Sequence, residues 1–148
     1  MCIIIDANFA SKIFSNPKHE DSIPVLTWLL KEGVVVYGGK LGQELFQVGM
    51  ARRSILELRR SGRAFQIDNE QVDNEEQVVV QMGVCKSDDP HIIALARVSG
   101  ARTLCSADGD LHEDFKKKQL IDKPRGCIYQ NCEHIALLKH TSGCRRPK

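Results

Sequence analysis

The amino-acid sequence predicts an α/β domain built on a central, mostly parallel sheet with helices on both faces. Short apolar runs rich in β-branched residues recur along the chain, and they are too uniformly apolar for half-exposed strands. Segments with helical periodicity separate these runs, as in alternating β and α units. The 148 residues suffice for one such domain, and no linker or internal repeat divides them.

Strands are expected where buried apolar runs end in turn-forming or polar residues. A glycine pair, Gly38-Gly39, ends the second run, and a turn at Pro124-Arg125-Gly126 precedes the last one. The expected strands cover 2–5, 34–37, 64–67, 103–106 and 127–129.

Helices are expected between these strands. The predicted helical segments are 8–14, 23–30, one long helix over 40–60, a helix that starts at 88–90 and ends at Gly100, 111–119, and a last stretch near 134–140. Residues 68–76 carry five acidic residues and no aromatic one, which indicates a solvated loop and a first helical turn leading into the apolar residues 78–82.

Composition excludes some classes of protein and leaves others open. The net charge of +2 neither favours nor opposes a nucleic-acid partner. No apolar run is long enough for a membrane helix, and no signal peptide is recognisable, so we expect a cytoplasmic protein with no membrane partner and reduced cysteines. Cys127, Cys132, His134 and Cys144 could furnish four zinc ligands, but their spacing is irregular and favours a strand and tail instead.

Carboxylates are expected to gather at one edge of the sheet. Asp6 follows the first strand, Asp108 follows the strand over 103–106, and Asp89 begins a helix. Glu44 lies on the apolar face of its helix, where a charge needs a partner. Ligands bind beyond the carboxyl ends of parallel strands. Since no Lys or Arg occupies a neighbouring motif position, converging carboxylates would repel one another unless they hold a hard divalent cation, Mg²⁺ or Mn²⁺.

Each of these acids also has a structural interpretation. Asp6 and Asp89 could cap the helices that follow them, and Asp108-Gly109 is a competent turn dipeptide. Each alone is more often structural. Their joint placement at one predicted edge favours the metal site.

The segments that carry these acids resemble the motifs of the PIN-domain ribonucleases in order and separation. The match spans almost the whole chain, so the resemblance implies a single three-layer sandwich domain over 1–148, with a basic tail from about 141. The matching segments are Ile3-Ile4-Ile5-Asp6, Leu41-Gly42-Gln43-Glu44-Leu45, Asp88-Asp89-Pro90-His91-Ile92-Ile93-Ala94-Leu95-Ala96 and Ser106-Ala107-Asp108-Gly109-Asp110-Leu111.

The resemblance implies a metal-dependent endonuclease that hydrolyses single-stranded RNA. It implies catalysis by an acidic quartet, in which Asp6 and Asp108 dominate direct binding of Mg²⁺ or Mn²⁺, while Glu44 and Asp89 act partly through water or a second ion. The quartet is Asp6, Glu44, Asp89 and Asp108, with Asp110 as an additional metal ligand and Ser106, Asn8 and Asp88 as accessory residues. Asp88 and Asp89 compete for the third position, and Asp89 fits the spacing to the following apolar run better.

Partners follow from the same resemblance. A dimer that joins two acidic clefts is expected, and the chain would be either the toxin of a toxin-antitoxin pair, with an antitoxin protein as partner, or an RNA-processing enzyme. Four arginines on the helix over 40–60 could contact RNA phosphates, although arginines in a last helical turn also suit the helix dipole on a solvated surface. They form two rows at seven-residue spacing, Arg52 with Arg59 and Arg53 with Arg60.

Rival functions fit the sequence less well. A catalytically inactive RNA-binding or interaction module of the same fold remains the alternative, although intact acidic positions speak against it. A phosphatase of the haloacid dehalogenase kind needs Asp-x-Asp after the first strand, where this chain has Asp6-Ala7-Asn8. A receiver domain would require paired acids near the first strand and a late Lys, an arrangement that is absent.

Overall fold

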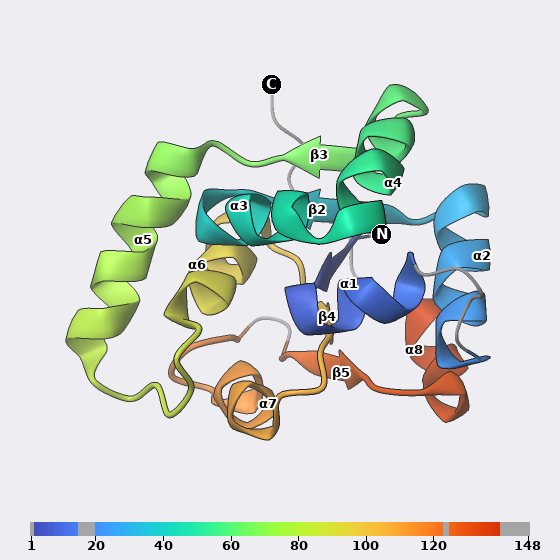
Figure 1. Ribbon diagram of the computed structural model, residues 1–148. Helices are drawn as coiled ribbons and strands as arrows, with labels where there is room; N and C mark the ends of the chain where they lie inside the picture. The colour runs from blue at the N-terminus through green and yellow to red at the C-terminus, as the bar shows by residue number, and fades with distance from the viewer. Residues whose placement is uncertain (1, 15–19, 123–124, 140–148) are drawn as a thin grey trace.

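A computed structural model describes residues 2–14, 20–122 and 125–139. It confirms the predicted α/β class: five parallel strands form one sheet in the order β3-β2-β1-β4-β5, with helices around it (Figure 1). The strands are β1 (Cys2–Ile5), β2 (Val34–Tyr37), β3 (Ala64–Gln66), β4 (Thr103–Cys105) and β5 (Cys127–Tyr129).

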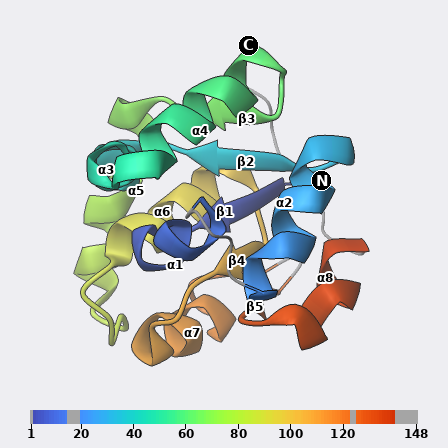
Figure 2. The same cartoon turned by 45° about the vertical axis from the view of Figure 1, so that its right-hand side comes forward.

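Helices connect the strands and cover both faces of the sheet. Connections between parallel strands are right-handed, so the two that lead from β1 to β3 place α1–α4 on one face, and those from β3 to β5 place α5–α7 on the other. Figure 2 shows β1 between α1 and α6. The helices are α1 (Ala7–Ile13), α2 (Ile23–Lys31), α3 (Gly39–Gln47), α4 (Gly49–Arg60), α5 (Asn69–Met82), α6 (Pro90–Ser99), α7 (Gly109–Lys116) and α8 (Ile135–Lys139), with single 3₁₀ turns at Glu20–Ser22 and Cys132–His134.

The prediction of one long helix over 40–60 is wrong. Val48 has extended backbone angles, φ −81° and ψ 115°, so α3 ends before it and α4 starts after it. A straight helix over this range would be about 30 Å long, far longer than strands of four residues. The break lets α4 bury Ala51, Ile55 and Leu58 against the domain instead of projecting from it.

The acidic segment 68–76 is helical rather than a loop. Asp68 caps α5, because its side chain accepts a hydrogen bond of 3.2 Å from the backbone N–H of Glu70. Val72 and Glu76 are buried, and the half-buried Glu75 pairs with Arg97 of α6 at 2.7 Å. The local capping signal and the buried positions therefore outweigh the high density of charge.

The hydrophobic core lies on both sides of the central strands. All residues of β1, β2 and β4 are buried, as expected for a parallel sheet covered on both faces. Cys85, Cys105 and Cys127 are free, but Cys2 is disulfide-bonded, so the prediction of reduced cysteines is wrong at that position. Within the described residues, no helix has the length and apolar character needed to cross a bilayer.

Gly38 links β2 to α3, and the turn at this point requires a glycine. Gly38 has φ 154° and ψ 169°, a combination that residues other than glycine rarely adopt. A Cβ at this position would lie 2.6 Å from the carbonyl oxygen of Ile67, which follows β3. Since α3 starts at the next residue, this close approach sets where α3 leaves the sheet.

We predict that Gly38→Ala lowers the free energy of unfolding by about 1–3 kcal/mol, because the methyl group adds a clash to a strained backbone. Gly49→Ala is the matched control: nothing lies within 4 Å of its Cβ, and alanine favours the first turn of α4. Urea unfolding of both variants makes the comparison. Equal losses of stability would contradict the role given to Gly38.

Candidate metal centre

Pairing between β1 and β4 brings two distant motifs together. Ile5 pairs with Cys105, so the next residues, Asp6 and Ser106, leave neighbouring strands side by side. The N–H of Asp6 donates to the Cys105 carbonyl at 2.9 Å, and Ser106 Oγ donates to Asp6 Oδ2 at 2.8 Å. Ser106 Oγ also accepts a hydrogen bond of 3.1 Å from the N–H of Asp108. The accessory residue Ser106 thus ties Asp6 to Asp108.

Helix capping explains only one of the three aspartates. Asp6 and Asp89 precede α1 and α6, yet neither side chain makes a capping hydrogen bond. Asp108 does cap α7, because it accepts from the N–H groups of Asp110 at 3.0 Å and Leu111 at 3.4 Å. Asp6, which is almost fully buried, and Asp89, which is half-buried, therefore have no capping role to explain their placement.

Glu44 meets a residue that sequence reasoning did not select, His91. Glu44 Oε1 and His91 Nε2 lie 2.6 Å apart, where α3 contacts α6. Both atoms are buried and face each other at ion-pair distance without hydrogen-bond geometry, and no other described group hydrogen-bonds to either atom. A bound ion or water is one explanation for such buried atoms. The signal available in the sequence was the position of His91, two residues after Asp89 in an otherwise apolar helix.

The same two residues and Asp89 line a pocket of about 390 Å³. One ligand atom from each of Glu44, Asp89 and His91 lies within 4.8 Å of the others, a spacing that a single cation can bridge. Carboxylate oxygens suit Mg²⁺ and Mn²⁺, and one imidazole nitrogen is compatible with Mn²⁺. The residues present therefore fit a divalent cation. The complete lining is Lys40, Gln43, Glu44, Gln47, Asp88, Asp89 and His91.

Asp89 lies within electrostatic range of the other three predicted carboxylates, and Asp6 lies within that range of Glu44. Burial raises the pKa of Asp6. The hydrogen bonds from Ser106 and from the backbone oppose this increase, and the negative charge of Glu44 adds to it. Burial is also the largest cause that raises the pKa of Asp89, and the negative charges of Asp6, Glu44 and Asp108 raise it further. His91 acts in the opposite direction on both aspartates. The four segments thus form one acidic cluster.

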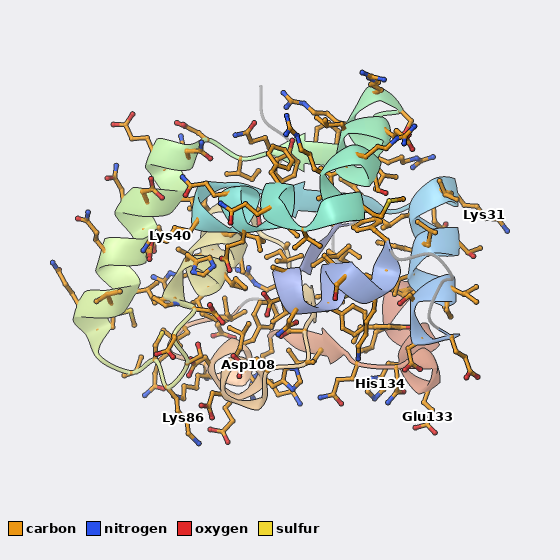
Figure 3. All side chains as sticks on the ribbon, in the orientation of Figure 1. Lys31, Lys40, Lys86, Asp108, Glu133 and His134 are labelled. Carbon is orange, nitrogen blue, oxygen red and sulfur yellow. The ribbon has the colours of Figure 1, made fainter. Side chains whose placement is uncertain are left out.

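The additional predicted residues lie around this cluster. Asp88 is exposed and lines the same pocket, but the carboxylate grouped with Glu44 and His91 is that of Asp89, on which the charges of Asp6 and Asp108 also act. Asn8 Oδ1 accepts from the N–H of Ala107 at 3.4 Å and holds the loop before Asp108. Asp110 is exposed and lies 3.5 Å from Lys86 Nζ, which corrects the expectation that no cation neighbours these acids. In Figure 3, Asp108, Lys86 and Lys40 share one side of the molecule.

A second residue that the sequence did not reveal, Asp114, fixes the loop before Asp89. It is fully buried in α7 and accepts at 2.8 Å from the N–H of Lys86 and at 2.8 Å from that of Ser87. Ser87 Oγ in turn accepts from the N–H of Asp89 at 3.3 Å. Burial works to raise the pKa of Asp114, but these hydrogen bonds and Lys117 outweigh it and lower the pKa. The ionised carboxylate therefore anchors the loop.

The predicted arginines do not join the acidic cluster. Arg52, Arg53, Arg59 and Arg60 are exposed on α4, which leads into the start of β3, whereas Asp6 and Asp108 follow the ends of their strands. Arg59 donates to the Tyr37 hydroxyl at 3.3 Å, and Arg53 pairs with Glu57 at 3.7 Å. Figure 1 shows α4 on the side away from α7.

The alternative zinc site falls largely outside the described residues. Cys144 and the basic tail from about 141 lie beyond them, and the side chain of Cys132 is not described. Cys127 is free and half-buried, and His134 Nδ1 accepts from the N–H of Gln130 at 3.1 Å. That ring nitrogen is engaged within the protein.

Comparisons with known proteins give no relative. No family model matches the chain, and no curated protein sequence or solved structure matches it.

We predict that Asp114→Asn lowers the free energy of unfolding by about 2–3 kcal/mol at pH 7, because it removes a charged acceptor from buried N–H donors. The folded-state pKa is lowered, so the wild-type advantage is present above the unfolded value of about 3.9 and declines as pH falls through the folded pKa. Urea unfolding from pH 7 to pH 3 measures this. Glu113→Gln, an exposed neighbour, should change little, and a pH-independent difference would refute the ionic anchor.

We predict that Asp89→Asn stabilises the metal-free protein at pH 7 and reduces the stabilisation by Mn²⁺. The raised pKa of Asp89 means that its charge opposes folding above that pKa, and this effect fades below the unfolded value of about 3.9. A cation bound only to the native state raises the melting temperature. Thermal melts with chelator and with Mn²⁺ test both effects, with Glu57→Gln, exposed on α4 away from the pocket, as control. Equal Mn²⁺ shifts in wild type and Asp89→Asn would show that Asp89 is no ligand.

Proposed function

We propose that the chain is a PIN-like, metal-dependent endoribonuclease that hydrolyses phosphodiester bonds of single-stranded RNA. The observation that carries the proposal is the grouping of Glu44, Asp89 and His91 at one pocket, with the charges of Asp6 and Asp108 acting on Asp89 from two further segments. The buried Oε1 of Glu44 and Nε2 of His91 add to it, because they face each other without hydrogen-bond geometry and a divalent cation could take both as ligands.

The four carboxylates would bind the cation from two different parts of the fold. Asp6 and Asp108, joined through Ser106, would hold the cation at the ends of β1 and β4, and Glu44 and Asp89 would hold it from α3 and α6. Bound Mg²⁺ or Mn²⁺ lowers the pKa of a water molecule and neutralises charge on the phosphate oxygens. In the hydrolysis, the water oxygen forms a bond to phosphorus and the bond from phosphorus to the 3′ oxygen breaks. The products are a 5′-phosphate and a 3′-hydroxyl.

Partners remain part of the proposal. Single-stranded RNA, a second copy of the chain and an antitoxin protein all rest on the resemblance to PIN-domain ribonucleases. The exposed arginines of α4 are available to RNA phosphates, but an RNA bound at the acidic cluster would have to pass around the domain to reach them.

We predict Mn²⁺- or Mg²⁺-dependent cleavage of single-stranded RNA that Asp6→Asn and Glu44→Gln each slow by about 100-fold or more, the scale for loss of one electrostatic group at a reaction centre. Glu57→Gln on α4 is the matched control and should cleave at the wild-type rate. End-labelled RNAs incubated with each metal or with excess chelator provide the assay, and circular dichroism checks folding. Binding of RNA without cleavage under any metal would instead favour the non-catalytic module.

A further inference from the structure

His91 is a polar residue in an otherwise apolar and buried part of α6. Its side chain is 6% exposed, and residues 92–96, which follow it, are apolar and fully buried. A polar side chain in such surroundings loses its hydration and needs a partner inside the protein. Packing alone would favour an apolar residue here, so the imidazole indicates a polar or ionic role.

The Nε2 atom of His91 faces the acidic cluster. It lies 2.6 Å from Glu44 Oε1 without hydrogen-bond geometry, so the ring nitrogen does not point directly at that oxygen. No other described group hydrogen-bonds to Nε2. Neighbouring ligands of an octahedral ion with bonds of about 2.1 Å lie about 3 Å apart. A small adjustment of the two side chains would therefore let one cation bind both atoms.

The ligand set of this centre mixes two kinds of atom. Glu44 and Asp89 supply carboxylate oxygens, and His91 supplies an imidazole nitrogen. Mg²⁺ takes oxygen ligands and keeps several waters, so it gains little from a nitrogen. Zn²⁺ favours several nitrogen or sulfur ligands, and no described cysteine belongs to the group. Mn²⁺ suits carboxylates and, as a transition-metal ion, also takes nitrogen ligands.

We propose that His91 is a metal ligand and makes the centre selective for Mn²⁺ over Mg²⁺. The two carboxylates attract either ion through their charge, whereas the imidazole adds a bond that favours Mn²⁺. This inference deepens the proposed function and rests on it for the reaction that the ion would serve. It assigns metal preference to a residue that is not one of the four predicted carboxylates.

A direct ion pair between protonated His91 and Glu44 is the competing explanation. In that pair the imidazolium repels a metal ion and competes with it for the carboxylate of Glu44. Removal of the imidazole would then strengthen the binding of Mn²⁺ and of Mg²⁺ alike. The ligand role predicts the opposite for Mn²⁺, so the two explanations differ in the sign of one measurable change.

The first experiment is calorimetric titration of the metal-free chain with Mn²⁺ and with Mg²⁺. We expect the wild type to bind Mn²⁺ about tenfold or more tightly than Mg²⁺. His91→Gln keeps a polar side chain and replaces the ring nitrogen with an amide. It should lose about tenfold or more in Mn²⁺ affinity, the scale on which changes around metal ligands act, with little change for Mg²⁺. His134→Gln is the matched control, because His134 Nδ1 accepts from the N–H of Gln130 outside the cluster.

The second experiment detects the nitrogen ligand directly. A nitrogen bonded to Mn²⁺ modulates the electron spin echo in pulsed electron paramagnetic resonance. We expect this modulation in the wild type and in His134→Gln, and its loss in His91→Gln. In the wild type it should change when the histidines carry ¹⁵N, a readout that needs no substitution and so does not depend on folding of a variant.

Several outcomes would overturn the proposal. These are equal affinities of the wild type for the two ions, tighter binding of both ions to His91→Gln, and a spin echo without nitrogen modulation. Cleavage assays separate this proposal from the proposed function. Nitrogen-bound Mn²⁺ with no RNA cleavage by the wild type would support the role of His91 and overturn the nuclease. Cleavage with Mg²⁺ and Mn²⁺ alike and no nitrogen modulation would do the reverse.

Discussion

The register between β1 and β4 is the constraint on which the candidate site depends. It pairs Ile5 with Cys105, so that Asp6 and Ser106 leave adjacent parallel strands at the same edge, although they are 100 positions apart in the chain. A slip of one residue would turn each side chain to the opposite face. The hydroxyl of Ser106 also accepts a hydrogen bond from the N–H of Asp108, and so holds Asp108 near Asp6. Both faces of these strands are buried, so such a slip would exchange the side chains that pack against the two layers of helices.

The edge that this register creates is electrostatically unfavourable without a ligand. Burial and mutual repulsion raise the pKa values of Asp6 and Asp89, so folding holds these carboxylates where their charged forms are disfavoured. The hydrophobic core of the sheet offsets that strain. The charge of Asp114, in contrast, stabilises the folded state, because backbone N–H groups donate hydrogen bonds to it. These hydrogen bonds also fix the loop that leads to Asp89. Such conflict between local charge and stable packing is typical of functional sites.

Helix α3 connects the acidic cluster to helices α5 and α6. It starts where Gly38 brings β2 against the segment after β3, and it ends at Val48, where the chain turns into α4. Within this short helix Glu44 meets His91 of α6, while Lys40 pairs with Glu76 of α5. These two pairs attach α3 to α5 and to α6, and so fix the position of Glu44.

The sequence by itself determined the class of fold, the strands and the order of the acidic motifs, because buried strands and helix periodicity are local patterns. It also supplied Asp6, Glu44, Asp89 and Asp108 as candidates. Only the tertiary structure decided that the helix over 40–60 breaks at Val48, that Asp89 rather than Asp88 joins the other acids, and that His91 and Asp114 complete their surroundings. These outcomes depend on contacts between elements far apart in the chain, and periodicity within one segment carries no information about them.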